Sequence, residues 1–452
     1  MIKVLLVDPP FHAFFEYDRW WYSFSCAQLA ACLREKNIEA YVYDADRYFK
    51  KDPKTNNREE MVRRRNWYLE GLKNTEHYIW EHFRKTLSEI KPHVVAVASW
   101  TSKLQSTFKI LEITKSFDSN IKTCVGGYHA TAIPDRFKNY KHIDATFVGP
   151  AEYTLPEWIL NGCKESLLIA KPKSIDIKKI PFPDREALLF PEHYLSTDMG
   201  MLMTSRGCPY DCTFCSNKLI TGRIYQHNSV DRVRKELQHI IERYHVGYLN
   251  VADANFLVNI KKSFEMAELF KEFGIPWGTE GRIDVVNDEL LERLINCGCT
   301  NLSFGIETGT NKGMKLLQKG ITIEDVAHAS KILNKHKIKW KCFFIAGFPH
   351  ETLEDMEDTR SFALSLGASY LSLNSFVPLP GTNIYNSWLP TFGNIPDEEL
   401  SQYNQLNPQA TFIKGVSPEA YREKFLSILS DFEAYNDSLG LNKEFHGKEI
   451  CS

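Results

Sequence analysis

Short apolar runs alternate with longer amphipathic stretches along the first third of the chain. Helical periodicity is clearest over residues 28–35 and 103–117. The runs between such stretches are rich in β-branched residues, as in strands that a parallel sheet buries on both faces. The predicted strands are Lys3–Asp8, Glu39–Asp44, His93–Ser99, Lys122–Val125 and Ala145–Val148. This order predicts a doubly wound, Rossmann-like α/β domain, whose ligands bind outside the carboxyl ends of the strands.

A second strand–helix alternation begins near residue 201. Its predicted strands are Met201–Thr204, Tyr248–Ala252, Trp277–Glu280, Asn301–Ile306, Cys342–Ala346 and Tyr370–Asn374. Six strand–helix units predict a partial (β/α)6 TIM-like barrel, in which reactive groups gather at the carboxyl ends of the strands. Distinctive residues follow these strands: Cys208, Asp253, Arg282, Glu307 and Gly347.

The composition changes divide the chain into four parts. We expect a Rossmann-like domain at 1–170 with a charged, aromatic insertion at 47–90, then a Pro- and Lys-rich linker at 171–195. The barrel would occupy 196–388, and a small, mostly helical C-terminal region 389–452. The basic run Arg63-Arg64-Arg65 in the insertion is read as a solvated helix face rather than a binding patch.

The composition excludes several classes of protein. With 452 residues, 43% hydrophobic and 25% charged, the chain fits a globular protein of more than one domain. A net charge of −2 indicates no nucleic-acid surface, and no apolar run is long enough to span a membrane. Eleven cysteines with one clustered triplet favour a reducing compartment over a disulfide framework. We therefore expect a cytoplasmic protein.

Three cysteines are grouped at spacing C-x3-C-x2-C, at Cys208, Cys212 and Cys215. Three thiolates so close in sequence can hold a soft metal centre, and Gly, Pro and Asp in the run favour a metal-wrapping turn over unrelated core cysteines. Zinc would normally take a fourth protein ligand, but the next candidates are His227 and Cys297. A [4Fe-4S] cluster on three thiolates would leave one iron open to a small molecule.

Glycines follow two predicted strands of the first domain, at Gly126-Gly127 and Gly149. They could let the backbone approach a ligand closely, or could simply form tight turns. The chain has no G-x-G-x-x-G element, so a nicotinamide dinucleotide is not expected.

Both halves of the chain resemble the cobalamin-dependent radical S-adenosylmethionine (SAM) enzymes. The cysteine spacing, with Phe214 before the third cysteine, is similar to their cluster loop. Between Val94 and Leu160, the segments VVAVASWTSK, VGGYHATAIPD and ATFVGPAEYTLPEW resemble the second half of their cobalamin-binding domain. Strand-end segments of the barrel also resemble theirs, at Asp253–Phe256, Phe304–Gly309, Phe344–Thr352 and Val377–Thr382.

The resemblance implies roles for particular residues. The catalytic and metal-binding set would be the three cysteines, holding a [4Fe-4S] cluster whose open iron binds SAM. The implied SAM contacts are Phe214, Asp253, Arg282, Glu307, Gly347 and Glu351. The implied cobalamin contacts are Ser99, Thr101, Gly126, Gly127, His129 and Gly149. Without the resemblance, Glu307 and Glu351 could be carboxylates at helix N-termini and Asp253 a helix cap.

Two features depart from the family. The chain lacks the Asp-x-His-x-x-Gly element that supplies histidine to cobalt in other cobalamin proteins, and an aromatic stretch, FHAFFEYDRWWYSFS, follows Pro10. This stretch could shape a substrate surface or pack on the next domain, and the first domain could have lost cobalamin binding. Cys297 and Cys299 are expected to be structural rather than ligands of an auxiliary cluster.

The resemblance implies radical chemistry on a small molecule in specialised metabolism, with electrons from a flavodoxin or ferredoxin. SAM cleavage would give a 5′-deoxyadenosyl radical, then a substrate carbon radical that methylcobalamin methylates. The alternative keeps both cofactors for a cyclisation, rearrangement, oxidation or non-standard SAM cleavage. A third hypothesis is a non-catalytic metal-binding protein. Substrate contacts are expected from Phe11–Phe24, 47–90 and the region beyond 390.

Overall fold

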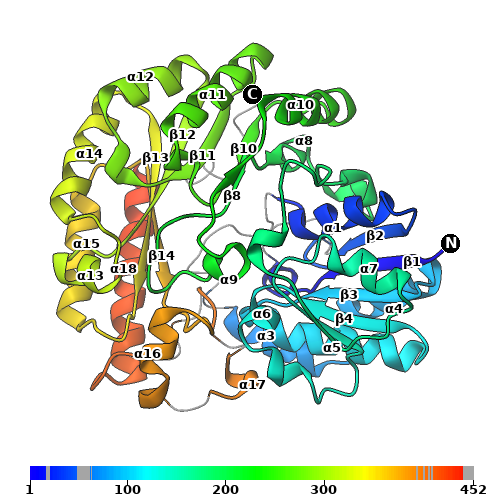
Figure 1. The fold of residues 1–452 in the computed structure, drawn as a ribbon. Helices are drawn as coiled ribbons and strands as arrows, with labels where there is room; N and C mark the ends of the chain where they lie inside the picture. Colours follow the sequence, from blue (N-terminus) through cyan, green and yellow to red (C-terminus); the bar gives the residue numbers. More distant parts are fainter. Residues whose placement is uncertain are drawn as a thin grey trace.

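Two six-stranded parallel sheets, each flanked by helices, form the framework of the protein in a computed structural model (Figure 1). The structure describes residues 1–16, 21–47, 62, 64–392, 395–400, 403–405, 408 and 411–440. The predictions for residues 17–20, for most of 48–63 and for the tail beyond 440 concern residues that the structure does not describe. Among the described residues, no helix is both long enough and apolar enough to cross a membrane.

The first sheet confirms the doubly wound domain. Its order is β2-β1-β3-β4-β5-β6, so the chain reverses direction across the sheet between β1 and β3. The strands are β1 (Lys3–Asp8), β2 (Glu39–Asp44), β3 (Val94–Ala98), β4 (Lys122–Gly126), β5 (Ala145–Val148) and β6 (Leu167–Ile169). The helices are α1 (Phe24–Arg34), α3 (Arg65–Lys73), α4 (Tyr78–Ile90), α5 (Leu104–Phe117), α6 (Tyr128–Ala132) and α7 (Thr154–Leu160).

The aromatic stretch after Pro10 mainly completes the core of this domain. Phe11 and Phe14 are buried, and the Phe14 ring lies 5.4 Å from that of Tyr68 and 5.7 Å from that of Trp80. These partners belong to α3 and α4, the helices of the insertion. Near its end the stretch reaches the next domain, where the Tyr22 hydroxyl donates to the carbonyl of Met201 over 3.2 Å. The described part of the insertion is therefore a packing layer.

The linker is fixed to both domains rather than being a free tether. Arg185 is buried and donates to the carbonyls of Met199 and Met201 over 3.0 and 2.7 Å. Its guanidinium also pairs with buried Glu236 at 3.0 Å. A buried guanidinium is stable only when its donors are satisfied in this way. The pairing fixes where the first barrel strand starts.

The second sheet confirms the partial barrel. Its order is β14-β13-β12-β11-β10-β7, and all of its neighbouring strands are parallel. The strands are β7 (Met201–Leu202), β10 (Leu249–Val251), β11 (Trp277–Gly281), β12 (Cys299–Glu307), β13 (Lys339–Ala346) and β14 (Tyr370–Ser375). A short antiparallel pair, β8 (Ser205–Arg206) and β9 (Gln226–His227), follows β7.

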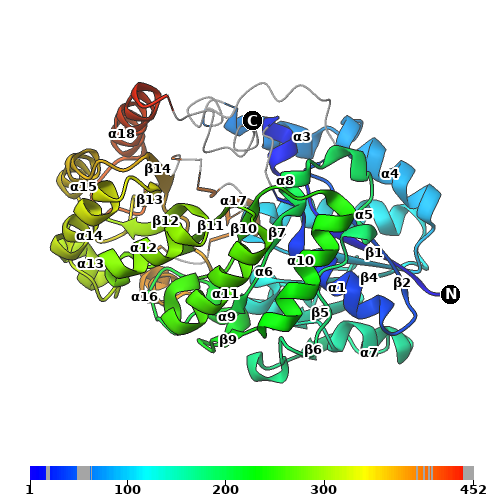
Figure 2. The ribbon, with the colours of Figure 1, turned by 90° about the horizontal axis from the view of Figure 1, so that it is seen from above.

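Helices cover the outer face of this sheet (Figure 2). They are α10 (Val230–Tyr244), α11 (Ile260–Phe273), α12 (Asp288–Asn296), α13 (Asn311–Leu316), α14 (Ile323–Lys335) and α15 (Leu353–Ser365). Two short helices lie elsewhere: α8 (Ser196–Met199) precedes β7, and α9 (Asn217–Thr221) packs against α6 of the first domain. The C-terminal helices are α16 (Asn383–Phe392), α17 (Asp397–Leu400) and α18 (Pro418–Ser438). Asn436 of α18 accepts from the backbone N–H of Leu371 over 2.9 Å, which ties this helix to the β14 edge.

The Cys297–Cys299 pair is buried in the packing between α12 and β12. Trp277 Nε1 donates to the Cys297 carbonyl over 2.8 Å, and Cys299 Sγ lies 3.6 Å from the Asn301 carbonyl. These contacts are those of core residues, as the structural interpretation requires.

Candidate active site

The three predicted cysteines lie in the loop between β8 and α9. All three are half-buried. Gly207 begins the loop with a φ of +91°, and a Cβ there would collide with the Ile224 carbonyl oxygen, so glycine is required. The loop is held on its far side by the Thr213 N–H, which donates to the Leu317 carbonyl over 3.0 Å. Its conformation is thus fixed by the backbone before any ligand binds.

The chemistry of this loop fits an iron–sulfur cluster. Burial raises the pKa of Cys208 and Cys215, while hydrogen bonds from the backbones of Tyr210 and Asn217 lower it. No three His, Cys, Asp or Glu side chains among the described residues are close enough to hold one metal ion. A cube-shaped cluster does not need such convergence, because each thiolate binds its own iron. The donor set therefore suits a cluster better than a single zinc ion.

Two cations flank the cysteines. The guanidinium carbon of Arg282 lies 3.9 Å from the centre of the Tyr210 ring, and its Nη2 donates to the Lys319 carbonyl over 2.6 Å. Lys319 Nζ donates to the Gly305 carbonyl over 2.9 Å and lies 5.9 Å from the centre of the Phe214 ring. The charges of both residues lower the pKa of Cys208. The sequence pointed to Arg282 and Phe214 as site residues but not to Lys319, because Lys319 follows a helix and belongs to no recognised motif.

Glu307 ends β12 in a strained conformation. Its φ is +73°, which is rare outside glycine, and the pairing with β13 is irregular between Gly305 and Glu307. Its Oε1 lies 3.6 Å from Lys319 Nζ. Burial raises the pKa of Glu307, and Lys319 lowers it. The bulge turns this carboxylate towards the cation that flanks the cysteines.

Asp253 has a supporting position. Its carboxylate is buried and accepts from the N–H groups of Thr204 and Ser205 over 2.7 and 3.0 Å, and from both hydroxyls over 2.6 Å. These four bonds join the end of β10 to the strand that leads into the cysteine loop. The SAM contact expected for Asp253 stays a prediction, whereas its role in holding the loop is direct.

Gly347 and Glu351 form one turn after β13. Glu351 Oε2 accepts from the N–H groups of Gly347 and Phe348 over 2.7 and 3.0 Å, while its buried Oε1 has no partner among the described residues. The Phe348 ring lies 5.8 Å from the ring of Phe214. The turn thus supports the aromatic residue of the cysteine loop.

Glu351 should make stability depend on pH. Burial raises its pKa to about 8 from an ordinary value of 4.5. Between these values the folded protein holds a proton that the unfolded chain has released, so the free energy of unfolding should fall as the pH rises through this window. Glu351→Gln should flatten that part of the profile, measured by urea unfolding at pH 5, 6, 7 and 8. Exposed Glu354→Gln should keep the wild-type slope, and equal slopes for both variants would contradict the assignment.

The six residues proposed to contact cobalamin gather at the carboxyl ends of β3, β4 and β5. The His129 N–H donates to the Ser99 carbonyl over 3.1 Å, and His129 Nδ1 lies 3.1 Å from Thr101 Oγ1. The Gly149 N–H donates to Thr131 Oγ1 over 2.9 Å. Two buried polar atoms, Ser99 Oγ and His129 Nε2, have no partner in the described part of the chain. Such orphaned atoms indicate that a polar ligand completes this edge of the sheet.

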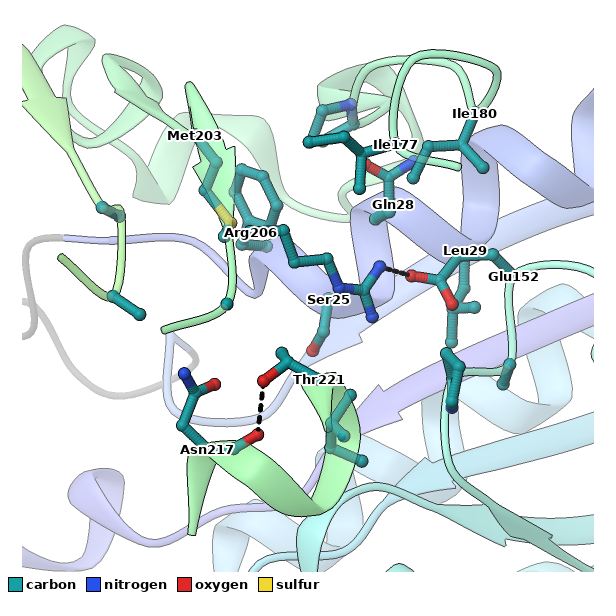
Figure 3. Close-up of a pocket in the computed structure, with 18 of the residues that line it drawn as sticks. Ser25, Gln28, Leu29, Glu152, Ile177, Ile180, Met203, Arg206, Asn217 and Thr221 are labelled. Atoms are coloured by element: carbon teal, nitrogen blue, oxygen red, sulfur yellow. Dashed lines mark hydrogen bonds and ion pairs between the residues drawn. The ribbon is translucent and has the colours of Figure 1, made fainter. Parts of the chain in front are cut away.

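A cavity of about 350 Å³ lies between the two domains (Figure 3). Gly127 and Gly149 line it from the first domain, and Ser205 and Gly207 line it from the barrel. Arg206, next to the cysteine loop, pairs across it with Glu152 (Figure 3). The glycine edge of the first sheet and the start of the cysteine loop therefore face one space.

The cavity offers unmet hydrogen-bonding groups in a mostly apolar wall. Asn217 Nδ2, a donor, and Asn228 Oδ1, an acceptor, are both buried without a partner among the described residues. Corrin carries primary amide side chains, each of which presents both an NH2 group that donates and a carbonyl oxygen that accepts. The residues present therefore fit cobalamin, and sequence reasoning missed both asparagines because neither follows a strand of a main sheet.

Two family models match the chain. Residues 202–363 match the radical SAM superfamily, and residues 59–159 match the B12 binding domain. Together they span the cysteine loop, most of the barrel and the glycine edge of the first sheet.

The chain is also similar to named proteins. It is 28% identical to an uncharacterized methyltransferase of Pyrococcus horikoshii, over 70% of this chain and 73% of that protein. It is 23% identical to the cytidylyl-2-hydroxyethylphosphonate methyltransferase of Streptomyces wedmorensis, over 88% of this chain and 84% of that protein. It is 25% identical to the anaerobic magnesium-protoporphyrin IX monomethyl ester cyclase of Rubrivivax gelatinosus, over 68% of this chain and 60% of that one.

Two solved structures share the architecture. The radical SAM methyltransferase TsrM of Kitasatospora setae, solved with tryptophan and a SAM analogue, superposes with a TM-score of 0.63 at 16% identity, over 86% of this chain and 76% of that one. The cobalamin-dependent SAM radical enzyme OxsB, solved with aqua-cobalamin and SAM, superposes with a TM-score of 0.60 at 17% identity, over 96% of this chain and 62% of that one. With both domains in one chain and both facing one cavity, the protein belongs to the radical SAM enzymes that carry a cobalamin-binding domain.

Proposed function

We propose that the protein is a radical SAM C-methyltransferase acting on a small molecule. The observation that carries the proposal is the shared cavity, because the glycine edge of the first sheet and the start of the cysteine loop both line it. Two relatives named as methyltransferases, each covered over more than two thirds of its length, support the reaction type. When bound, the cluster and SAM supply a carbon radical and cobalamin supplies a methyl group.

The residues of the chain would hold and orient these groups. Cys208, Cys212 and Cys215 would ligate the cluster, with Phe214 packed beside it on Phe348. Arg282 would face the carboxylate of SAM. Glu307 and the turn Gly347–Glu351 would face the other polar parts of SAM. Asp253 would act by fixing the strand before the cysteine loop. An external protein such as a flavodoxin or ferredoxin would deliver electrons.

The proposal is tested with SAM that carries a deuterated methyl group. Reconstituted protein is incubated anaerobically with this SAM, a reductant and a metabolite extract of the host. Transfer predicts a metabolite that gains the labelled methyl group, together with S-adenosylhomocysteine. 5′-Deoxyadenosine without a labelled metabolite would favour the second candidate, a cyclisation or other bond formation, which the similarity to the Rubrivivax cyclase supports.

Gly127→Ala is expected to weaken cobalamin binding by at least about tenfold. Gly127 has a φ of +101°, and a Cβ there would lie 3.0 Å from the Ser99 carbonyl oxygen, at the edge that we propose to bind cobalamin. The strain itself should cost about 1–3 kcal/mol. Gly274→Ala is the control, because Gly274 also has a positive φ of +65° but nothing within 4 Å. Absorbance titration with hydroxocobalamin measures the change, and equal affinities for both variants would contradict it.

A further inference from the structure

Among the residues that the structure describes, the interior of the barrel is open rather than packed. On β13, Trp340, Cys342 and Phe344 are buried, whereas the alternating Lys341 and Phe343 are half-exposed. The buried set faces the covering helices, since Trp340 Nε1 donates to Asn334 of α14 over 2.9 Å. The half-exposed set therefore faces the barrel interior. A filled barrel would bury this inner set as a core, so within the described part of the chain the inner face borders an open space, which we call the chamber.

One level of this chamber carries opposite charges. The strand register places Glu280 beside Ser303, Ser303 beside Lys341, and Lys341 beside Tyr370. Lys341 Nζ lies 4.7 Å from the ring centres of both Phe343 and Tyr370. Glu280 and Lys341 stand two strands apart, or about 10 Å between their backbones. At this level of the sheet, the carboxylate of Glu280 and the ammonium group of Lys341 therefore lie on the same inner face but on strands that are not neighbours.

Glu280 is the group without a partner. It is exposed, yet it makes no hydrogen bond or ion pair with any residue that the structure describes. Burial raises the pKa of Glu280, Lys341 lowers it and Glu307 raises it. A side chain that lines an internal space can have accessible surface and still be surrounded by protein. This explains why Glu280 is exposed and yet has its pKa raised by burial. A carboxylate in such a place is stabilised by a cation that comes to it.

Towards the amino-terminal ends of the strands, below Glu280, side chains close the chamber. Towards the carboxyl ends, above Glu280, the chamber leads to the cysteine loop. Below, Asn301 Nδ2 donates to the Tyr248 hydroxyl over 2.6 Å, and a Cβ on Gly278 would collide with both side chains. Above, Arg282 follows two residues later, beside Tyr210 of the cysteine loop. A ligand that reaches into the chamber from the reactive end therefore meets Glu280 near its floor.

We propose that Glu280 binds a protonated amine of the substrate inside the barrel. This inference rests on the proposed function, because it takes the cysteine loop as the reactive end. The substrate class is a small molecule whose ammonium or guanidinium group enters the barrel while the carbon to be modified stays near the loop. Lys341 helps to keep Glu280 ionised without neutralising it, since the two do not form an ion pair.

The test compares amines with uncharged analogues on the reconstituted enzyme, without turnover. Tryptamine, phenethylamine and agmatine are titrated by calorimetry, beside tryptophol and 2-phenylethanol as the matched alcohols. Wild type should bind at least one of these amines at least about tenfold more tightly than a matched alcohol binds. Glu280→Gln, which keeps the shape of the side chain, should remove the preference. Glu289→Gln, an exposed glutamate on α12, should retain it.

Three outcomes would overturn the proposal. They are no amine binding, equal binding of amines and alcohols, or a preference that survives in Glu280→Gln. A fourth outcome would reassign the residue: Glu280→Gln weakens SAM as much as it weakens the amines, which would make Glu280 part of the SAM site. Because binding is measured without reaction, loss of the amine site leaves the methyl-transfer assay to be judged on its own.

Discussion

Replacing Cys212 with alanine is expected to remove the bound iron and reduce SAM cleavage to background. The loop offers three thiols and, among the described residues, no other group of metal ligands close by. Two thiolates would leave two irons of a cube-shaped cluster without protein ligands, so the cluster should not survive purification. Iron and sulfide analysis of anaerobically purified protein, with the absorbance spectrum, measures the loss. The fold should persist, because the loop backbone is anchored independently through Thr213.

Cys163→Ala is the matched control for this variant. Cys163 is also half-buried but belongs to the first domain. It should keep wild-type iron content, cobalamin binding and SAM cleavage. A Cys212→Ala protein that retained its iron, or a wild-type protein that contained only zinc, would contradict the cluster assignment.

Asp253→Asn is expected to destabilise the barrel strongly although it keeps the size of the side chain. The carboxylate accepts four hydrogen bonds from Thr204 and Ser205, two at each oxygen. In asparagine one of these oxygens becomes an NH2 group, which cannot accept, so two of the four bonds are lost. Burial raises the pKa of Asp253, and the bonds from Ser205 and Thr204 lower it. We expect a loss of about 3 kcal/mol in the free energy of unfolding, measured by urea denaturation.

The same variant should also bind less iron, because Ser205 and Arg206 lead directly into the cysteine loop. Asp358→Asn on the exposed face of α15 should change neither property. Thr204→Val, which removes one of the four donors, should cost about 1 kcal/mol. Unchanged stability in Asp253→Asn would show that Thr204 and Ser205 do not depend on this carboxylate.

The periodicity of the sequence determined the two sheets and their order along the chain. Short β-branched runs separated by helical stretches have few stable arrangements other than parallel sheets covered by helices, and the carboxyl ends of such strands meet at one edge. The sequence therefore also predicted that Ser99, Gly127 and His129 would lie together. The cysteine loop was readable for a similar reason, since its ligands are local in sequence.

The long-range contacts of these elements could not be read from the sequence. The four hydrogen bonds of Asp253, the position of Lys319 beside Phe214, and the packing of Phe14 on Tyr68 join residues that are distant in the chain. Periodicity tells which face of an element is apolar, but it does not tell which other element covers that face.

The sequence by itself thus determined the two α/β halves, and it singled out the loop that we propose to bind the cluster and the sheet edge that we propose to meet cobalamin. Only the tertiary structure decided that the loop and the edge share one cavity, and that Glu280 lines the inner face of the barrel with no partner among the described residues. The physical reason is that strand register and domain contact place residues from separate strands at one level. A pattern along one chain cannot contain that placement.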